Sequence, residues 1–389
     1  MEHPSSTNVK VIFALTLIHF IGDFYYSFVN PLLPAFVDKY SLTLTQVGLI
    51  AAISRLFAFI IQPWVGYFAD RFRTRFFVLG GPILAIIFIS LVGIAPNFLI
   101  LLLFISFGAI GASMFHPTSA GMVSTYSGGH YGFSMSIFNM GGTFAFGVGP
   151  LFITYFVSTY GLGASPFTML FGLVVVAILF KITPLFRQEP LENLGLIDTV
   201  KEVFGKVWKS IVLIWVIMVL RTFAAQSFMT YIPVLYAKEG YSLVSIGSLI
   251  SIITVTGAIS GLVAGHLSDR FGYKPIFHIA HTLATPSLYL LLYLPGNWVF
   301  FSAFWVGLFS MATLPLGLAM ALELAPKGKS MIASLMMGLA FGTGGMIIPL
   351  MGKLADIFSI RTVLFFLAMI PLLSNGLILL LPAKKLKPS

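Results

Sequence analysis

Long, uninterrupted apolar stretches recur along the whole sequence, and they constrain the fold more than any other feature. A helix that crosses a bilayer needs about 20 predominantly apolar residues. We identify twelve such stretches, at residues 10–38, 43–69, 76–95, 98–125, 130–157, 164–185, 210–237, 243–268, 275–294, 298–324, 329–355 and 360–382. Their apolar residues are continuous rather than alternating, which excludes an outer-membrane β-barrel. The sequence therefore predicts an all-α membrane protein with twelve transmembrane helices.

The composition excludes several other classes of protein. Of the 389 residues, 58% are hydrophobic and only 9% are charged, whereas soluble domains carry about 25% charged residues. The absence of cysteine excludes a disulfide-stapled secreted domain. The net charge is +10, but the basic residues lie between apolar stretches rather than on a polar domain, so we expect no nucleic-acid partner. The expected surroundings are a lipid bilayer, and the expected state is a monomer.

The lysines and arginines indicate the orientation, because cytoplasmic loops are enriched in both. With both termini in the cytoplasm, sixteen of the 22 basic residues lie in cytoplasmic loops or at cytoplasmic span ends, four lie at or beyond the outer ends, and two lie deep within spans. The two within spans are Arg55 and Arg221. We therefore expect a multi-pass protein of the cell (inner) membrane with both termini in the cytoplasm.

The sequence divides into two similar halves. The longest polar segment, residues 187–209, is expected to be a cytoplasmic linker with a short amphipathic helix. It separates a bundle of six helices in residues 1–186 from another in residues 210–389. Residues that recur at offsets of 197 to 199 are Gly48 and Gly247, Asp70 and Asp269, Pro117 and Pro315, and Met140 and Met337. Duplicated halves around a central binding site are typical of secondary transporters.

A loop motif is repeated at the ends of the second and eighth spans. The pattern G-x-x-x-D-R-F comprises Gly66, Asp70 and Arg71 in the first copy and Gly265, Asp269 and Arg270 in the second. It resembles the signature of the major facilitator superfamily, and the resemblance extends over the whole chain. It implies two pseudo-symmetric six-helix bundles, with the motif residues acting as a cytoplasmic gate. Glu323 is expected either to join this gate or to be solvated.

Within that superfamily, further stretches resemble the fosmidomycin-resistance efflux proteins. These stretches are residues 19–23, 115–117, 127–129, 136–142, 149–150, 338–345 and 354–356. Where that family has a glutamate and an arginine after His-Pro, this chain has Thr118 and Gly121. The segment 147–150 resembles the antiporter motif of exporters. The resemblance thus implies drug efflux, with antibiotic resistance as the associated phenotype.

Ionisable residues inside spans are costly in a bilayer and indicate functional sites. His19 and Asp23 are four residues apart and share one face of the first span. Together with His116 of the fourth span, they are the candidates for proton coupling, since histidine titrates near neutral pH. The alternatives are that Asp23 only holds two helices together and that His116 binds backbone groups freed at Pro117.

Five further residues are candidate substrate-binding groups: Tyr26, Arg55, Asn139, Arg221 and Gln226. Arg55 could instead form a structural ion pair with Asp23. Arg221 has no acidic neighbour on its own span, which favours contact with an anionic substrate or with a partner across a cavity. Near the end of the eleventh span, Lys353 and Asp356 are expected to pair with each other.

The sequence contains no catalytic motif, zinc-binding spacing or nucleotide-binding P-loop. We therefore expect no enzymatic activity, no bound metal and no cofactor, with the proton gradient as the energy source. The predicted function is proton-coupled export of small amphipathic or anionic compounds by alternating access. The alternative is an importer or facilitator of a small organic metabolite with the same fold.

Overall fold

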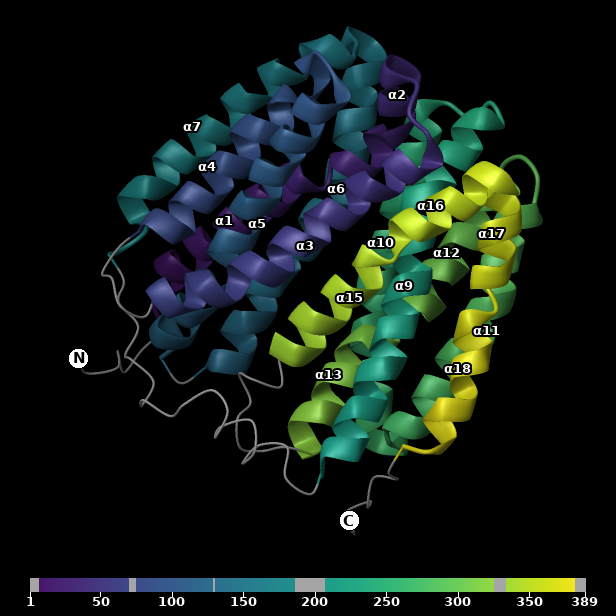
Figure 1. Cartoon of the computed structure of the whole chain (residues 1–389). Helices are drawn as coiled ribbons and strands as arrows, with labels where there is room; N and C mark the ends of the chain where they lie inside the picture. The colour runs from purple at the N-terminus through teal and green to yellow at the C-terminus, as the bar shows by residue number, and fades with distance from the viewer. Residues whose placement is uncertain (1–6, 70–74, 129, 186–206, 325–333, 382–389) are drawn as a thin grey trace. The chain divides into compact units, whose positions relative to one another are not determined.

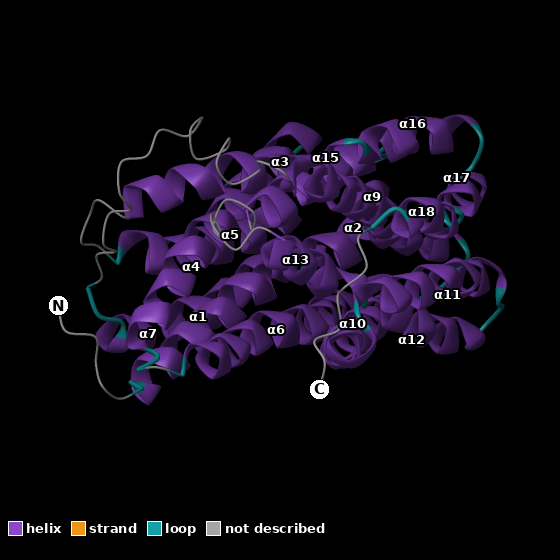
Figure 2. Ribbon diagram, turned by 90° about the horizontal axis from the view of Figure 1, so that it is seen from below, coloured by secondary structure: helices purple, strands orange, loops and turns teal. Residues whose placement is uncertain are grey.

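The computed structural model describes residues 7–69, 75–128, 130–185, 207–324 and 334–381, and these ranges contain helices but no strand (Figures 1 and 2). Eleven segments within them are long and apolar enough to cross a membrane, which confirms the all-α membrane class. The helices are α1 (Val9–Tyr26), α2 (Val29–Tyr40), α3 (Leu44–Ala69), α4 (Phe76–Ser90), η1 (Leu91–Ile94), α5 (Phe98–Tyr126), α6 (Tyr131–Tyr160), η2 (Leu162–Phe167), α7 (Thr168–Ile182), α9 (Trp208–Lys238), α10 (Leu243–Phe271), α11 (Tyr273–Tyr293), α12 (Trp298–Met311), α13 (Thr313–Leu324), η4 (Ser334–Leu339), α15 (Ala340–Met346), α16 (Ile348–Ile357), α17 (Ile360–Leu367) and α18 (Ile370–Leu379).

Prolines divide some of the spans that the sequence predicts as single helices. Pro31 has no amide hydrogen to donate to the carbonyl of Ser27, and the first span changes there from α1 to α2. Pro315 likewise cannot donate to Met311, the last residue of α12, and α13 begins two residues later. Both places still lie within single candidate spans, Val9–Tyr40 and Trp298–Ala321, so each proline interrupts a helix without ending the predicted span.

The expected span 329–355 is not among the eleven. Its described part consists of the π-helical turn η4 and the short helices α15 and α16, and residues 325–333 lie outside the described ranges. Pro349 lies in the first turn of α16, where a proline is tolerated, whereas it could not continue a helix from α15 without losing a hydrogen bond. No single helix in this described part is therefore long enough to cross a bilayer.

The described residues group into two compact units. The first contains the residues up to Leu42, those from Ile53 to the end of α7, and Gly240–Ser251. The second contains Thr43–Ala52, α9 and the residues after Ser251. The first turns of α3 thus group with the second unit, although the rest of α3 belongs to the first. The first turns of α10 group with the first unit, although the rest of α10 belongs to the second. Most of the expected linker 187–209 lies outside the described residues.

Each unit is built around one central helix (Figure 1). In the first unit α1 contacts α4, α5, α6 and α7. In the second unit α9 contacts α13, α15, α16, α17 and α18. The approach of α1 to α5 is close at Gly22, where a Cβ would lie 2.5 Å from the ring of Phe115. Only a residue without a side chain fits there, and this approach brings the next residue of α5, His116, towards α1.

One polar contact occurs at equivalent positions in both units. Arg75, at the start of α4, donates to the carbonyl of Phe180 in α7 at 2.9 Å. Lys274, at the start of α11, donates to the carbonyl of Leu379 in α18 at 2.6 Å. Both members of the second pair lie 199 residues after their counterparts. The repetition therefore extends beyond sequence motifs to a contact that joins two helices of each unit.

Candidate functional site

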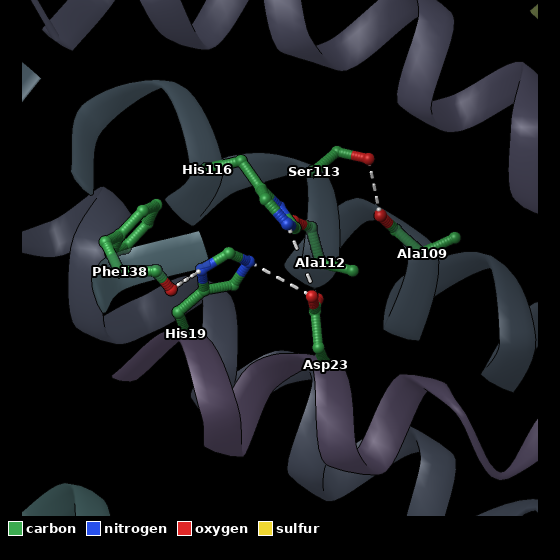
Figure 3. Close-up of polar contacts among 7 residues, drawn as sticks. All are labelled: His19, Asp23, Ala109, Ala112, Ser113, His116 and Phe138. Atoms are coloured by element: carbon green, nitrogen blue, oxygen red, sulfur yellow. Dashed lines mark hydrogen bonds and ion pairs between the residues drawn. The ribbon is translucent and has the colours of Figure 1, made fainter. Parts of the chain in front are cut away.

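Three ionisable side chains meet inside the first unit (Figure 3). His19 Nε2 lies 3.1 Å from Asp23 Oδ2, and His116 Nε2 lies 3.4 Å from Asp23 Oδ1. The side chains of His19 and Asp23 are 8% and 6% exposed, and that of His116 is 34% exposed. We call this set the His–Asp–His cluster. It combines the helical pair of α1 with a residue from α5.

The other nitrogen of each imidazole binds a backbone carbonyl. His19 Nδ1 lies 2.8 Å from the carbonyl oxygen of Phe138 in α6, and the two rings are stacked (Figure 3). His116 Nδ1 lies 2.6 Å from the carbonyl oxygen of Ala112, one turn earlier in α5. The helix is unbroken through Pro117, and the carbonyl that this proline frees is that of Ser113. His116 therefore contacts the Ala112 carbonyl and not the Ser113 carbonyl that Pro117 frees.

These anchors determine which nitrogen carries hydrogen. A carbonyl oxygen only accepts hydrogen bonds, so each Nδ1 must be the protonated, donating nitrogen. The Nε2 atom of a neutral ring is then a bare acceptor, and it faces a carboxylate oxygen that is also an acceptor. Each of the two contacts is attractive only when a proton or another cation lies between the atoms. The cluster is thus a site for positive charge, shared between His19, Asp23 and His116.

A glycine of α6 forms one wall of this site. A Cβ on Gly142 would overlap His19 Nε2 and would lie 2.7 Å from Asp23 Oδ2, well inside van der Waals contact. Any larger residue there would displace the imidazole or the carboxylate. His116 is the most exposed member of the cluster, so its side of the cluster is the open one.

The ion pair between Arg55 and Asp23, the alternative role for Arg55, is not formed. Asp23 is bound by the two histidines, and Arg55 has no ion pair with any residue in the described ranges. Tyr26 is half-buried and Asn139 is exposed, and neither has a recorded contact with the cluster among the described residues. Their roles as substrate-binding residues stay predictions.

Arg221 is buried in the second unit, where its guanidinium contacts α12 (α9 and α12 are labelled in Figure 1). Its Nε donates to the carbonyl of Ser310 at 3.1 Å, and Nη2 lies 3.2 Å from the sulfur of Met311. Both partners lie at the end of α12, where Pro315 interrupts the helix. No acidic residue of the described ranges pairs with Arg221. A small cavity borders it, lined also by His281. Gln226, one turn further along α9, is half-buried.

The expected cytoplasmic gate lies mostly outside the described residues. Asp70 and Arg71 belong to the range 70–74, and Gly66 and Asp269 are described only as parts of their helices. Arg270 and Glu323 are exposed. A Cβ on Gly265 would have no described atom within 4 Å, so no close helix contact is found at this glycine among the described residues. The gate stays a prediction.

A different set of contacts holds the first turn of α3. The carboxylate of Asp356 accepts hydrogen bonds from the backbone amides of Leu44 and Thr45 and from the hydroxyl of Thr45. The expected pair between Lys353 and Asp356 was therefore wrong, because the carboxylate is turned towards α3. This contact between Asp356 and α3 was not predicted from the sequence. The one sequence feature near it that could have indicated a close contact is Gly48, which recurs in the repeat as Gly247.

Both of these repeated glycines lie in tight contacts. A Cβ on Gly48 would lie 2.8 Å from the Cα atom of Pro349. A Cβ on Gly247 would lie 2.7 Å from the carbonyl oxygen of Pro150. The two prolines are themselves 199 residues apart, as the two glycines are. The opening turns of α3 and α10 are therefore packed in equivalent ways.

Comparisons with known proteins cover most of the chain. A sequence model described as the Major Facilitator Superfamily matches residues 15–285 and 239–389. The fosmidomycin resistance protein of Escherichia coli (strain K12) is 26% identical over 373 residues, covering 94% of this chain and 91% of the relative. The quinolone resistance protein NorA of Staphylococcus aureus (strain Mu50 / ATCC 700699) is 24% identical over 302 residues, covering 74% of this chain and 75% of the relative.

Solved structures are similar in fold. A bacterial homolog of the human lysosomal transporter Spinster, in an inward-facing and occupied conformation, superposes with a TM-score of 0.80. It is 18% identical, and the match covers 95% of this chain and 96% of the other. A mutant form of the nucleoside transporter NupG has a TM-score of 0.79 at 12% identity, and the match covers 95% of this chain and 99% of the other.

Proposed function

Because this chain belongs to the Major Facilitator Superfamily and is a multi-pass membrane transporter, we propose that it couples the proton gradient to the export of small amphipathic or anionic compounds. The observation that carries the proposal is the His–Asp–His cluster. Its atoms need a shared positive charge, and it lies on helices that are long and apolar enough to cross the membrane. Export is favoured by the relatives named for fosmidomycin and quinolone resistance.

Proton movement would follow from the geometry of the cluster. Asp23 has a histidine at each carboxylate oxygen, so a proton taken up at one contact can be passed to the other without crossing open space. His116, the most exposed member, is the entry point. Alternating access would then link occupancy of the cluster to the side on which the substrate is released.

The candidate substrate groups lie on both halves of the sequence. In this proposal Tyr26, Arg55 and Asn139 contribute from the first half, and Arg221 and Gln226 from the second. Arg221 is the residue that would select an anionic group, because it is a buried cation without an acidic partner in the described ranges.

The proposal also includes the membrane location, the topology and the energy source of the protein. The protein would lie in the inner membrane as a monomer with both termini in the cytoplasm, and would use neither ATP nor a bound cofactor. The partners are protons, substrate and lipid. The gate formed by the repeated D-R-F loops would open and close the cytoplasmic side.

The test is transport by purified protein in proteoliposomes with an imposed pH gradient. Candidate substrates include fosmidomycin and a fluoroquinolone. Asp23→Asn should reduce gradient-driven transport by more than about tenfold while the protein still inserts, since the carboxylate is lost. His130→Gln, which alters an exposed histidine outside the cluster, is the matched control.

Full gradient-driven transport by Asp23→Asn would overturn the assignment of Asp23. The direction is tested by reversing the gradient: accumulation on the side from which protons leave supports export by exchange. Accumulation on the side to which protons move would instead support the alternative, an importer of a small metabolite.

A further inference from the structure

We propose that the His–Asp–His cluster also binds a divalent transition-metal ion of the Zn²⁺ type, in place of the protons it would otherwise hold. The inference goes beyond transport, because it concerns binding to the protein at rest. His19, Asp23 and His116 each offer one ligand atom, and all three atoms lie within 4.8 Å of one another.

The distances suit a tetrahedral ion. With metal–ligand bonds of about 2.0–2.1 Å, neighbouring ligand atoms of a tetrahedral site are about 3.3 Å apart. The two observed nitrogen–oxygen distances, 3.1 and 3.4 Å, are close to this value, but they end on different oxygens of Asp23. The carboxylate therefore turns, or the His116 ring shifts, so that one oxygen and both Nε2 atoms surround a single ion; the three ligand atoms already lie within 4.8 Å of one another. The least constrained ligand is His116, whose more exposed side chain leaves room for adjustment. Binding thus requires little rearrangement of α1.

The histidines are oriented as metal ligands usually are. A ligating histidine commonly donates its second ring N–H to a carbonyl or carboxylate, which fixes the ring and directs the free lone pair at the metal. Here His19 Nδ1 is held by the Phe138 carbonyl and His116 Nδ1 by the Ala112 carbonyl (Figure 3). Both Nε2 lone pairs therefore face the carboxylate of Asp23, beside which the ion would lie.

The type of ligand selects the ion. Two imidazole nitrogens and one carboxylate oxygen suit Zn²⁺, Co²⁺, Ni²⁺ or Cu²⁺, whereas Mg²⁺ and Ca²⁺ prefer sites made of oxygen atoms. Three protein ligands leave a fourth position for water, on the side where His116 is exposed. The sequence spacing did not reveal this site, because its ligands come from two helices.

Cobalt absorption provides the test. Four-coordinate Co²⁺ absorbs visible light much more strongly than six-coordinate Co²⁺, so a strong band reports the site directly. The full chain would be purified in detergent through a tag without histidine, titrated with Co²⁺, and then with Zn²⁺ to displace it. We expect one ion per chain in the wild type, and an affinity reduced more than about tenfold in His116→Gln and in Asp23→Asn.

His130→Gln is the matched control and should bind as the wild type does, since it removes a histidine outside the cluster. Absence of the strong band from folded wild-type protein would overturn the proposal. So would equal binding by wild type, His116→Gln and Asp23→Asn, because the ion would then lie elsewhere. The assay uses neither gradient nor substrate, so its failure would be distinct from a failure of proton-coupled transport.

Discussion

Thr45 donates both its backbone amide and its hydroxyl to Oδ2 of Asp356, at 2.9 and 2.6 Å. The amide of Leu44 donates to Oδ1 of the same carboxylate at 2.7 Å. Amides in the first turn of a helix have no partner within that helix, so Asp356 caps α3 from α16. Partial burial would raise the pKa of the Asp356 carboxyl, but these hydrogen bonds and the charge of Lys238 together hold the pKa below its ordinary value of 3.8.

Removing this cap should lower stability in a pH-dependent way. Asp356→Ala should cost about 1 kcal/mol at neutral pH, the usual size of a lost helix cap. Because the folded pKa is depressed, the contribution of the carboxylate is complete above 3.8 and is lost as the pH falls through the folded value. Thermal unfolding of both proteins from about pH 7 to about pH 3 measures the difference. Lys353→Ala, in the same helix, is the control; a difference that does not shrink in acid would contradict the charged cap.

Gly48 should not tolerate a methyl group. In Gly48→Ala the Cβ would overlap the hydroxyl oxygen of Tyr231 and would lie 2.8 Å from the Cα atom of Pro349, and backbone atoms cannot move aside cheaply. We expect a loss of about 1–3 kcal/mol, the usual cost of overpacking. Gly376→Ala in α18 meets no described atom and should instead stabilise by up to about 1 kcal/mol through helix propensity. If Gly48→Ala and Gly376→Ala changed the unfolding temperature by the same amount in the same direction, the tight contact at Gly48 would be contradicted.

Gly142→Ala should disable the His–Asp–His cluster without touching its three residues. The added Cβ would overlap His19 Nε2 and Asp23 Oδ2, so one of them must turn away. Gradient-driven transport should fall by more than about tenfold and the strong Co²⁺ band should disappear. Gly163→Ala, where a Cβ has nothing within 4 Å, is the control for a glycine change in a well-spaced position. Wild-type activity in Gly142→Ala would show that the cluster can expand.

Arg221 can be tested for two roles at once. Lysine keeps the charge but not the planar donors that bind the Ser310 carbonyl and approach the Met311 sulfur. Arg221→Lys should lower stability by about 1–3 kcal/mol, the cost of a buried carbonyl without its donor. A raised KM for an anionic substrate at unchanged stability would show instead that the guanidinium serves the substrate. Lys10→Arg, which exchanges an exposed cation outside the candidate substrate groups, is the control for a change of cation.

The spans and the duplication could be predicted because they depend on local composition and on repeated motifs. The pairing of His19 with Asp23 could also be anticipated, because residues four apart share a helix face. That His116 joins this pair could be proposed only because it is another ionisable residue inside a span. Which ring nitrogen faces Asp23 depends on the carbonyl of Phe138, and nothing in the sequence near His19 specifies that contact.

Other features depend on residues that are distant in the sequence. Asp356 and Thr45 are 311 residues apart, so the sequence favoured the nearby Lys353 as the partner. The alternative ion pair between Arg55 and Asp23 is not formed, because two histidines already contact the carboxylate. Helix breaks were missed because a proline in an apolar stretch does not by itself decide between a bend and an interruption: α5 continues through Pro117, whereas the tenth span divides before Pro315.

The contact between Arg75 and Phe180 has a consequence for how the chain is made. Both residues are synthesised before any part of the second copy, and the contact joins the start of α4 to α7. The contact can nevertheless form only after translation has moved well into the second copy, and it closes α7 onto α4 before the later spans are complete. The contact between Lys274 and Leu379 joins α11 to α18 in the same way once those helices have been made.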